Sequence, residues 1–118
     1  MKTTANHFKM YQKMVKKWQK ELGLMNYSLG FRHNNDHPDS ESWVVAETED
    51  GNAVAGLTSN WDEAITTHSI ERAAFHEMHE LLMWEIRCLL RQVLSEEVVN
   101  KKIHAVIRPL ENLLFPVA

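Results

Sequence analysis

The stretch Ile70-Glu-Arg-Ala-Ala-Phe-His-Glu-Met-His-Glu-Leu-Leu82 decides the fold, because it predicts a long helix with a polar stripe. We expect this helix to extend to about Val93. At about 100° per residue, Glu80 lies about 40° and Arg87 about 20° from His76 on the helical wheel. Apolar side chains occupy nearly all the remaining circumference. The pattern therefore indicates a mostly buried helix with three ionisable groups on one line.

This stripe is a candidate metal site. Buried ionisable groups are costly unless they are paired or bind a metal, and His76 and Glu80 are one turn apart, so both can reach one ion. Glu77 is turned to the side, where it could accept a proton from water, as in the His-Glu-x-x-His helix of zinc hydrolases. His79 could also share an ion with His76. The alternative is an internal pair of His76 and Glu80, neutralised by Arg87.

Carboxylate oxygen is an acceptable zinc ligand, so Glu80 does not forbid a site, although the standard motif has histidine at this position. With seven histidines in a chain of 118 residues, chance occurrence of such a spacing is low but not negligible.

The other elements follow from periodicity. An apolar seam predicts a helix over Ala5–Leu22, and Gly23 suits its end. Ser69 is the expected cap of the long helix, and Ser95 that of a last helix reaching Leu114, in which Pro109 should weaken the backbone near Ala105. Apolar alternation and a turn at 49–52 predict strands around Tyr27–Phe31, Trp43–Thr48 and Ala53–Thr58. We therefore predict an α+β fold: an N-terminal helix, a three-stranded antiparallel sheet, the motif helix and a closing helix.

Length and composition favour a single domain over residues 1–118. One cysteine excludes an internal disulfide, and no apolar run suits a signal peptide or a membrane span, so we expect a cytoplasmic protein. The net charge is −3, but it is unevenly distributed. Residues 1–22 hold six lysines against one glutamate, a net +5, and the remainder holds seven basic and fifteen acidic side chains, a net −8.

The order of elements, with the motif stretch and Ala53-Val-Ala-Gly-Leu-Thr-Ser-Asn-Trp61, resembles the small zincin-like metallopeptidase-type proteins encoded in phage and prophage genomes. The resemblance covers most of the chain, from Trp18 to the final helix. It implies one zinc ion bound by His76 and Glu80, with Glu77 as general base. It also implies that Ala53–Thr58 is the sheet edge along which an extended peptide would lie.

A catalytic zinc site needs a third protein ligand, and the resemblance puts His104 of the segment Ile103-His104-Ala-Val-Ile-Arg-Pro-Leu-Glu-Asn-Leu-Leu114 in that position. The helical wheel places His104 on the polar face, so Glu97, Glu111 and His79 stay open as substitutes. Glu80 and Pro109 depart from the family pattern.

Two functions are therefore expected. The first is a zinc-dependent metallopeptidase-like activity. The second is a non-catalytic phage-type binding protein or inhibitor that keeps the fold and docks through the lysines of the first helix. Its partner would be a host protein and, less readily, nucleic acid.

Overall fold

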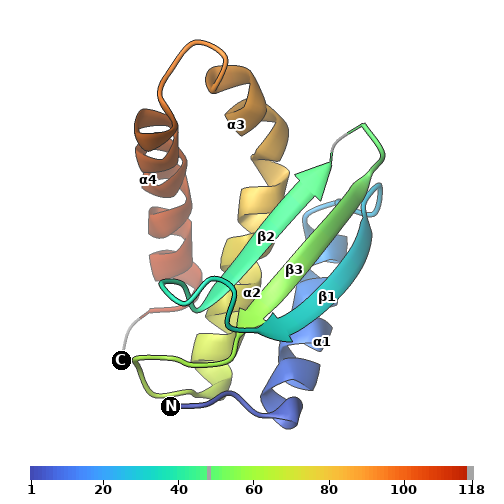
Figure 1. The fold of residues 1–118 in the computed structure, drawn as a ribbon, viewed down its shortest axis with the longest axis vertical. Helices are drawn as coiled ribbons and strands as arrows, with labels where there is room; N and C mark the ends of the chain where they lie inside the picture. Colours follow the sequence, from blue (N-terminus) through green and yellow to red (C-terminus); the bar gives the residue numbers. More distant parts are fainter. Residues whose placement is uncertain (48, 117–118) are drawn as a thin grey trace.

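The computed structural model describes residues 1–47 and 49–116 and has a layer of helices on one face of a small sheet (Figure 1). The elements are, in order, α1 (Ala5–Glu21), β1 (Ser28–Asn34), β2 (Ser42–Glu47), β3 (Asn52–Thr58), α2 (Thr67–Leu82), α3 (Trp84–Leu90) and α4 (Glu96–Leu114). The predicted α+β class is confirmed. Within the described residues, no helix is long and apolar enough to cross a membrane.

Helix α1 forms where the apolar seam predicts it. Thr4 caps its start by accepting a hydrogen bond from the backbone N–H of His7, and Gly23 follows its end at φ +72°, which glycine adopts without strain. Tyr11 and Val15 of the seam are fully buried against the sheet and α2. The seam thus fixes α1 beside α2 in the helical layer.

The sheet corrects the prediction of three antiparallel strands. Its strand order is β1-β3-β2, with β1 parallel and β2 antiparallel to β3. The hairpin between β2 and β3 is as predicted, with Glu47 opposite Asn52 and Gly51 at φ +68°. Thr48, which we assigned to the second strand, lies outside the described residues. The rule that sequential strands are neighbours fails for β1 and β2, because β3 lies between them.

Strand β3 is central because its apolar run Ala53–Thr58 is buried almost throughout. The expectation that Ala53–Thr58 is a free edge is therefore wrong, since its backbone pairs with a strand on each side. The sheet edge beside α2 is β2 instead.

The helix expected over residues 69–93 begins earlier and is interrupted. Thr66 is the cap of α2, and Ser69 is the third helical residue that reciprocates in the capping box. The helix is interrupted at Met83, and a separate helix, α3, follows and ends at Leu90. Ser95 caps α4 as expected, and the helix continues on both sides of Pro109.

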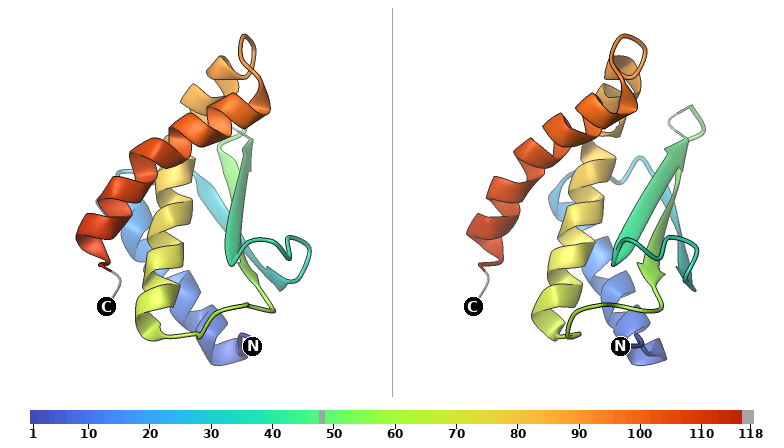
Figure 2. Two further views of the ribbon diagram at one scale, coloured as in Figure 1. Left: turned by 90° about the vertical axis from the view of Figure 1, so that its left-hand side faces the viewer. Right: turned by 60° about the vertical axis from the view of Figure 1, so that its left-hand side comes forward.

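Helix α4 crosses α2 on the side away from α1 (Figure 2). It is attached by a small separate cluster of Val99, Ile103 and Ile107, against which Met83 and Leu90 pack. The main core lies between the sheet, α1 and α2. Helix α4 therefore depends on few apolar contacts, and polar groups contribute much of what faces α2.

Candidate metal centre

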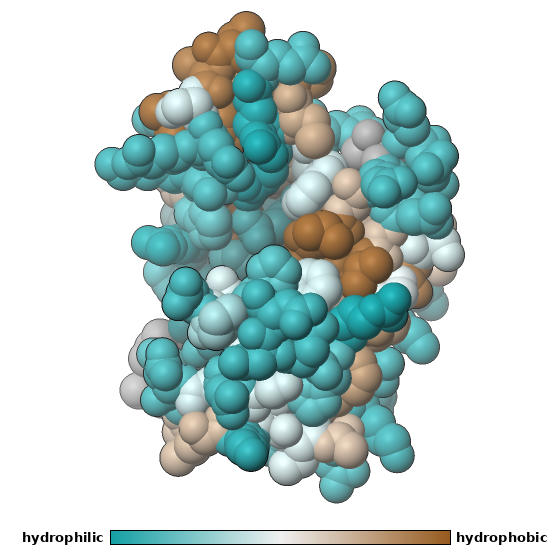
Figure 3. Space-filling model, in the orientation of Figure 1, coloured by the Kyte–Doolittle hydropathy of each residue, from teal (hydrophilic) through white to brown (hydrophobic). Residues whose placement is uncertain are grey.

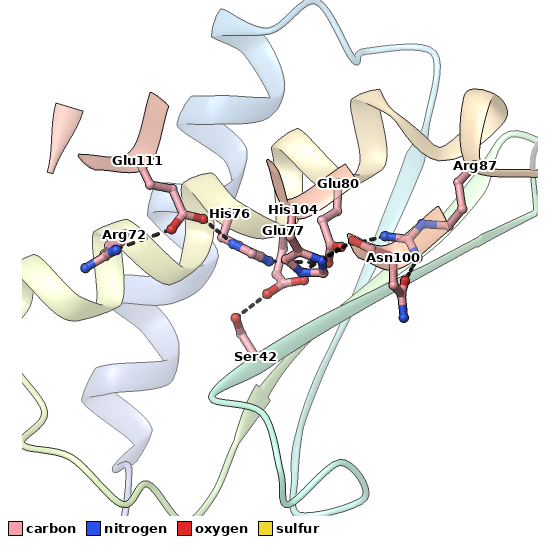
Figure 4. Close-up of polar contacts among 9 residues, drawn as sticks. All are labelled: Ser42, Arg72, His76, Glu77, Glu80, Arg87, Asn100, His104 and Glu111. Carbon is pink, nitrogen blue, oxygen red and sulfur yellow. Dashed lines mark hydrogen bonds and ion pairs between the residues drawn. The ribbon is translucent and has the colours of Figure 1, made fainter. Parts of the chain in front are cut away.

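His76 and Glu80 of α2 meet His104 of α4 in one cluster (Figure 4). The Nε2 atom of His76 lies 3.5 Å from Oε2 of Glu80. The Nε2 atom of His104 lies 3.5 Å from Oε1 of the same carboxylate. One ligand atom from each residue lies within 4.8 Å of the others, and all three residues are half-buried. The ligand set predicted from the sequence is thus brought together.

These separations fit a bound metal ion. Ligand atoms about 2.0–2.1 Å from a tetrahedral zinc ion lie about 3.3–3.4 Å from one another. The two nitrogen–oxygen distances of 3.5 Å are close to this value, although they run to different oxygens of Glu80, and the three ligand atoms as a set lie within 4.8 Å of one another. The cluster could therefore hold one ion after small movements of the side chains.

Both histidines also direct the correct nitrogen toward the cluster. The Nδ1 atom of His76 is hydrogen-bonded to Oε1 of Glu111, and Nδ1 of His104 donates to the carbonyl oxygen of Asn100 at 2.8 Å. An acceptor at Nδ1 holds the proton there and leaves Nε2 free to bind metal, which is the usual arrangement of metal-binding histidines.

Arg72 supports Glu111 from α2. Its Nε atom lies 3.4 Å from Oε2 of Glu111, and its Nη2 atom donates to Oδ1 of Asn112 at 3.2 Å. Burial opposes ionisation of Glu111, but the hydrogen bond with His76 and the charges of His76 and Arg72 lower the pKa of Glu111 overall. Glu111 is thus an ionised partner of His76.

Without a metal, His76 is protonated between two carboxylates. Burial alone would lower the pKa of His76, but hydrogen bonds with Glu111 and Glu80 and the nearby carboxylate charges raise it to about 10. The pKa of Glu80 is lowered overall, because contacts with His76 and the charge of Arg87 outweigh its burial. A metal ion would take the place of the His76 proton.

Arg87 of α3 lies on the other side of Glu80. Its Nη2 atom donates to Oε1 of Glu80 at 2.8 Å, and its Nη1 atom donates to Oδ1 of Asn100. The residue as a whole is only 8% exposed. The predicted neutralisation of Glu80 by Arg87 is therefore present, and it coexists with the ligand cluster.

Glu77 is the most buried carboxyl group of the site, with 3% of the residue exposed. The hydroxyl of Ser42, the first residue of β2, donates to its Oε2 atom. Its Oε1 atom is buried and accepts no hydrogen bond from the part of the chain that the structure describes. Burial and the charge of Glu80 raise the pKa of Glu77 to about 8, against the opposing effects of His76 and Ser42.

The other ligand candidates lie elsewhere. His79 is buried on the core side of α2, where its ring packs edge-on against Phe75 at 5.5 Å, so it cannot share an ion with His76. Glu97 is exposed near the start of α4 and does not line the site. Glu111 contacts His76 at its far nitrogen and acts as its supporting partner instead of a third ligand.

A pocket of about 530 Å³ opens over the cluster, within the usual size range of ligand sites. Its walls come from β2, the loop before β2, α2, α3 and α4. Sequence reasoning missed Ser42, Asn100 and Trp84 among its lining residues, because none belongs to a metal-binding motif. Only the sheet order puts β2 beside α2.

Comparisons with protein-family models, with characterised proteins and with solved structures found no match. The assignment of a metal centre therefore rests on the geometry of these residues.

Proposed function

We propose that this chain is a zinc-dependent metallopeptidase-like protein of the zincin type, as phage and prophage genomes encode, with His76, Glu80 and His104 as zinc ligands. One observation carries the proposal. Two histidines with anchored Nδ1 atoms turn Nε2 toward one carboxylate, each at 3.5 Å, inside a pocket. An ion pair alone needs one such histidine, whereas a metal needs several donors.

Zinc in a site with three protein ligands supplies a Lewis acid and lowers the pKa of a water molecule to about 7. Glu77 is the side chain that would accept the proton of that water. Ser42 holds Oε2 of Glu77, and Oε1 has no hydrogen-bond partner in residues 1–47 and 49–116, so one oxygen is available for this task. Without a metal ion the pKa of Glu77 is about 8, so its carboxyl is mostly protonated at neutral pH. The positive charge of a bound ion would lower this pKa and leave the ionised carboxylate that the role of general base requires.

The free edge of β2 supports an extended peptide as substrate. Strand β2 pairs with β3 on one side, and residues Ser42–Val45 of β2 line the pocket. A peptide could add to this edge by backbone hydrogen bonds and lie across the ligand cluster. This position replaces the one expected along Ala53–Thr58.

The first experiment measures the metal content of the full chain, purified without chelators and without a histidine tag. We expect one zinc ion per chain, and we expect His76→Ala to abolish binding. His68→Ala is the matched control, because His68 is an exposed residue of the same helix. Equal metal content in wild type and His76→Ala would contradict the metal site and favour the alternative, in which His76 and Glu80 form an internal pair.

The alternative function is non-catalytic binding through α1. Lys9, Lys13, Lys16 and Lys20 fall within about 60° of the helix circumference, and all are exposed. Among the described residues, only Lys17 of α1 forms an ion pair, with Glu71 at 3.3 Å. An unneutralised row of cations attracts an anionic partner.

This alternative is tested by salt-dependent retention on an immobilised polyanion. Retention should fall in the variant with Lys13→Glu and Lys16→Glu, while zinc content stays unchanged. Zinc-free wild-type protein that retains polyanion binding would favour the alternative, and equal retention of wild type and variant would remove it.

A further inference from the structure

We propose that Arg87 is a positioning residue of the metal centre, which holds two of the three ligands, Glu80 directly and His104 through Asn100. The inference rests on the proposed metal site. It adds a residue that the His-Glu-x-x-His pattern does not contain and explains how a carboxylate serves at the fifth position of that pattern.

Arg87 fixes one oxygen of the Glu80 carboxylate. The guanidinium occupies Oε1 of Glu80 at 2.8 Å, whereas Oε2 faces Nε2 of His76 at 3.5 Å. A carboxylate held at one oxygen has lost much of its rotational freedom. Arg87 thus leaves Oε2 as the oxygen that is free to bind the ion, and Nε2 of His104, which lies 3.5 Å from Oε1, would turn toward it.

Arg87 also connects to α4. Its Nη1 atom donates to the side chain of Asn100, and the backbone oxygen of Asn100 accepts from Nδ1 of His104. The apolar contacts of α4 are those of the small cluster of Val99, Ile103 and Ile107, and its other polar contacts with α2 include those of Glu111 with His76 and Arg72. One guanidinium therefore orients ligands that come from two different helices (Figure 4).

The role depends on an arginine at this position. Arginine carries its donors in a rigid planar fork, so it can bind Glu80 and Asn100 at the same time. The donors of lysine are gathered on one ammonium nitrogen, which does not have this planar geometry. The guanidinium also lies 6.0 Å from the ring of Trp84, which helps to fix its plane. The positive charge of Arg87 offsets the negative charge of Glu80, which a histidine at position 80 would not carry.

The experiment measures the dissociation constant of zinc for the full chain by competition with a chromophoric chelator. We expect Arg87→Ala to weaken zinc binding by about 10–100-fold, as loss of a supporting contact typically does. Arg87→Lys should recover only part of this loss. Arg91→Ala is the matched control, because Arg91 lines the same pocket but, within the described part of the chain, pairs only with exposed Glu96, at 3.6 Å. It should stay within about twofold of wild type.

A second arm separates positioning from folding. Glu80→His replaces the carboxylate with a neutral ligand, so Arg87 has no carboxylate to hold and places its positive charge near the ion. In this background, Arg87→Ala should weaken zinc binding much less than in the wild-type background, because only the contact through Asn100 is lost. This double variant also has no unpaired Glu80 to destabilise the fold. The ligand-field spectrum of bound cobalt should change with Arg87→Ala and stay constant with Arg91→Ala.

The outcomes are distinguishable. Wild-type protein that binds no zinc removes the proposed function and the role of Arg87 together. Zinc binding by wild type that is unaffected by Arg87→Ala removes the role of Arg87 alone. An equal loss of affinity in the wild-type and Glu80→His backgrounds also overturns it, because Arg87 would then act on the fold and not on Glu80.

Discussion

At the residue scale, Glu77 is the residue that can distinguish the proposed catalysis from metal binding alone, because it is next to the candidate ligand His76 but has a different partner. Ser42 binds one of its oxygens, and the other has no hydrogen-bond partner among the described residues. A buried carboxylate with one unpaired oxygen is unfavourable for stability. Such an arrangement is typical of a group that acts on a bound molecule.

The first prediction is that Glu77→Gln abolishes turnover and spares the site. The amide oxygen can still accept from Ser42, and the amide cannot take a proton. We expect zinc content and Tm close to wild type, and any peptidase activity lowered by about 100-fold or more. Metal analysis, thermal melting and cleavage of a broad peptide library measure the three properties.

Two results would contradict a catalytic Glu77. One is wild-type turnover in the Glu77→Gln protein. The other is a fully zinc-loaded wild type that cleaves no peptide of the library, in which case the chain binds metal without peptidase function.

The second prediction concerns Glu111, which holds Nδ1 of His76 and is itself held by Arg72. Glu111→Gln keeps the size of the side chain but removes the charge that supports the histidine. We expect zinc affinity to fall by about 10–100-fold. Glu97→Gln, which changes an exposed carboxylate of the same helix, is the control and should leave the affinity as it is. Equal affinities of the two variants would show that Glu111 has no part in metal binding.

At the scale of elements, the contact between β2 and β3 depends on a glycine. A Cβ atom at Gly56 of β3 would lie 1.9 Å from Cε2 of Trp43, the residue opposite it on β2. No side chain fits there unless the indole moves. Glycine at this position lets Trp43 cover the central strand.

The third prediction is that Gly56→Ala destabilises the sheet by about 1–3 kcal/mol, the usual cost of overpacking. Gly30→Ala is its control, because the nearest atom to a Cβ there is 3.8 Å away. Urea unfolding followed by tryptophan fluorescence measures both. A Gly56→Ala protein as stable as Gly30→Ala would mean that Trp43 does not pack on β3 as described.

Element positions were predictable wherever the signal is local. The seam of α1, the turn at 49–52 and the cap at Ser95 each depend on residues within a few positions, and all three are present in the structure. The strand order was not predictable in this way. It depends on which strand is buried on both sides, and the run Ala53–Thr58 was interpreted as an edge although its nearly continuous apolar character is that of a central strand.

The residues of the candidate site were likewise predictable only where the signal is local. His76 and Glu80 are one turn apart, so their proximity follows from the helix alone. His104 joins them only through the packing of α4 on α2, and the helical wheel could not distinguish it from Glu97 and Glu111. Ser42 and Asn100 carry no motif, and no local pattern would have selected them.

At the scale of the whole molecule, the candidate metal site lies between two helices that are attached to the fold to different degrees. Helix α2 is part of the main core, whereas α4 has its own small cluster. Ile86, Leu89 and Val93, on α3 and in the turn that follows it, are exposed apolar residues. Figure 3 shows hydrophobic surface at the top, the end of the molecule at which Figure 1 draws α3. An ion bound between His76 and His104 would therefore act as a tie between α2 and α4.

The last prediction is that zinc stabilises the fold and does so most at α4. Free zinc at about 100 times its dissociation constant should raise the free energy of unfolding by about 2.7 kcal/mol, because the ion binds the folded chain. For a domain of this size that is a rise in Tm on the order of 10 °C. Amides of α4 should gain hydrogen-exchange protection beyond those of α1, since a local opening that separates α4 from α2 also releases the ion. Chelation should reverse both effects, His68→Ala should keep them, and His76→Ala should lose them. A zinc-dependent rise in Tm that persists in His76→Ala would put the ion somewhere other than between α2 and α4.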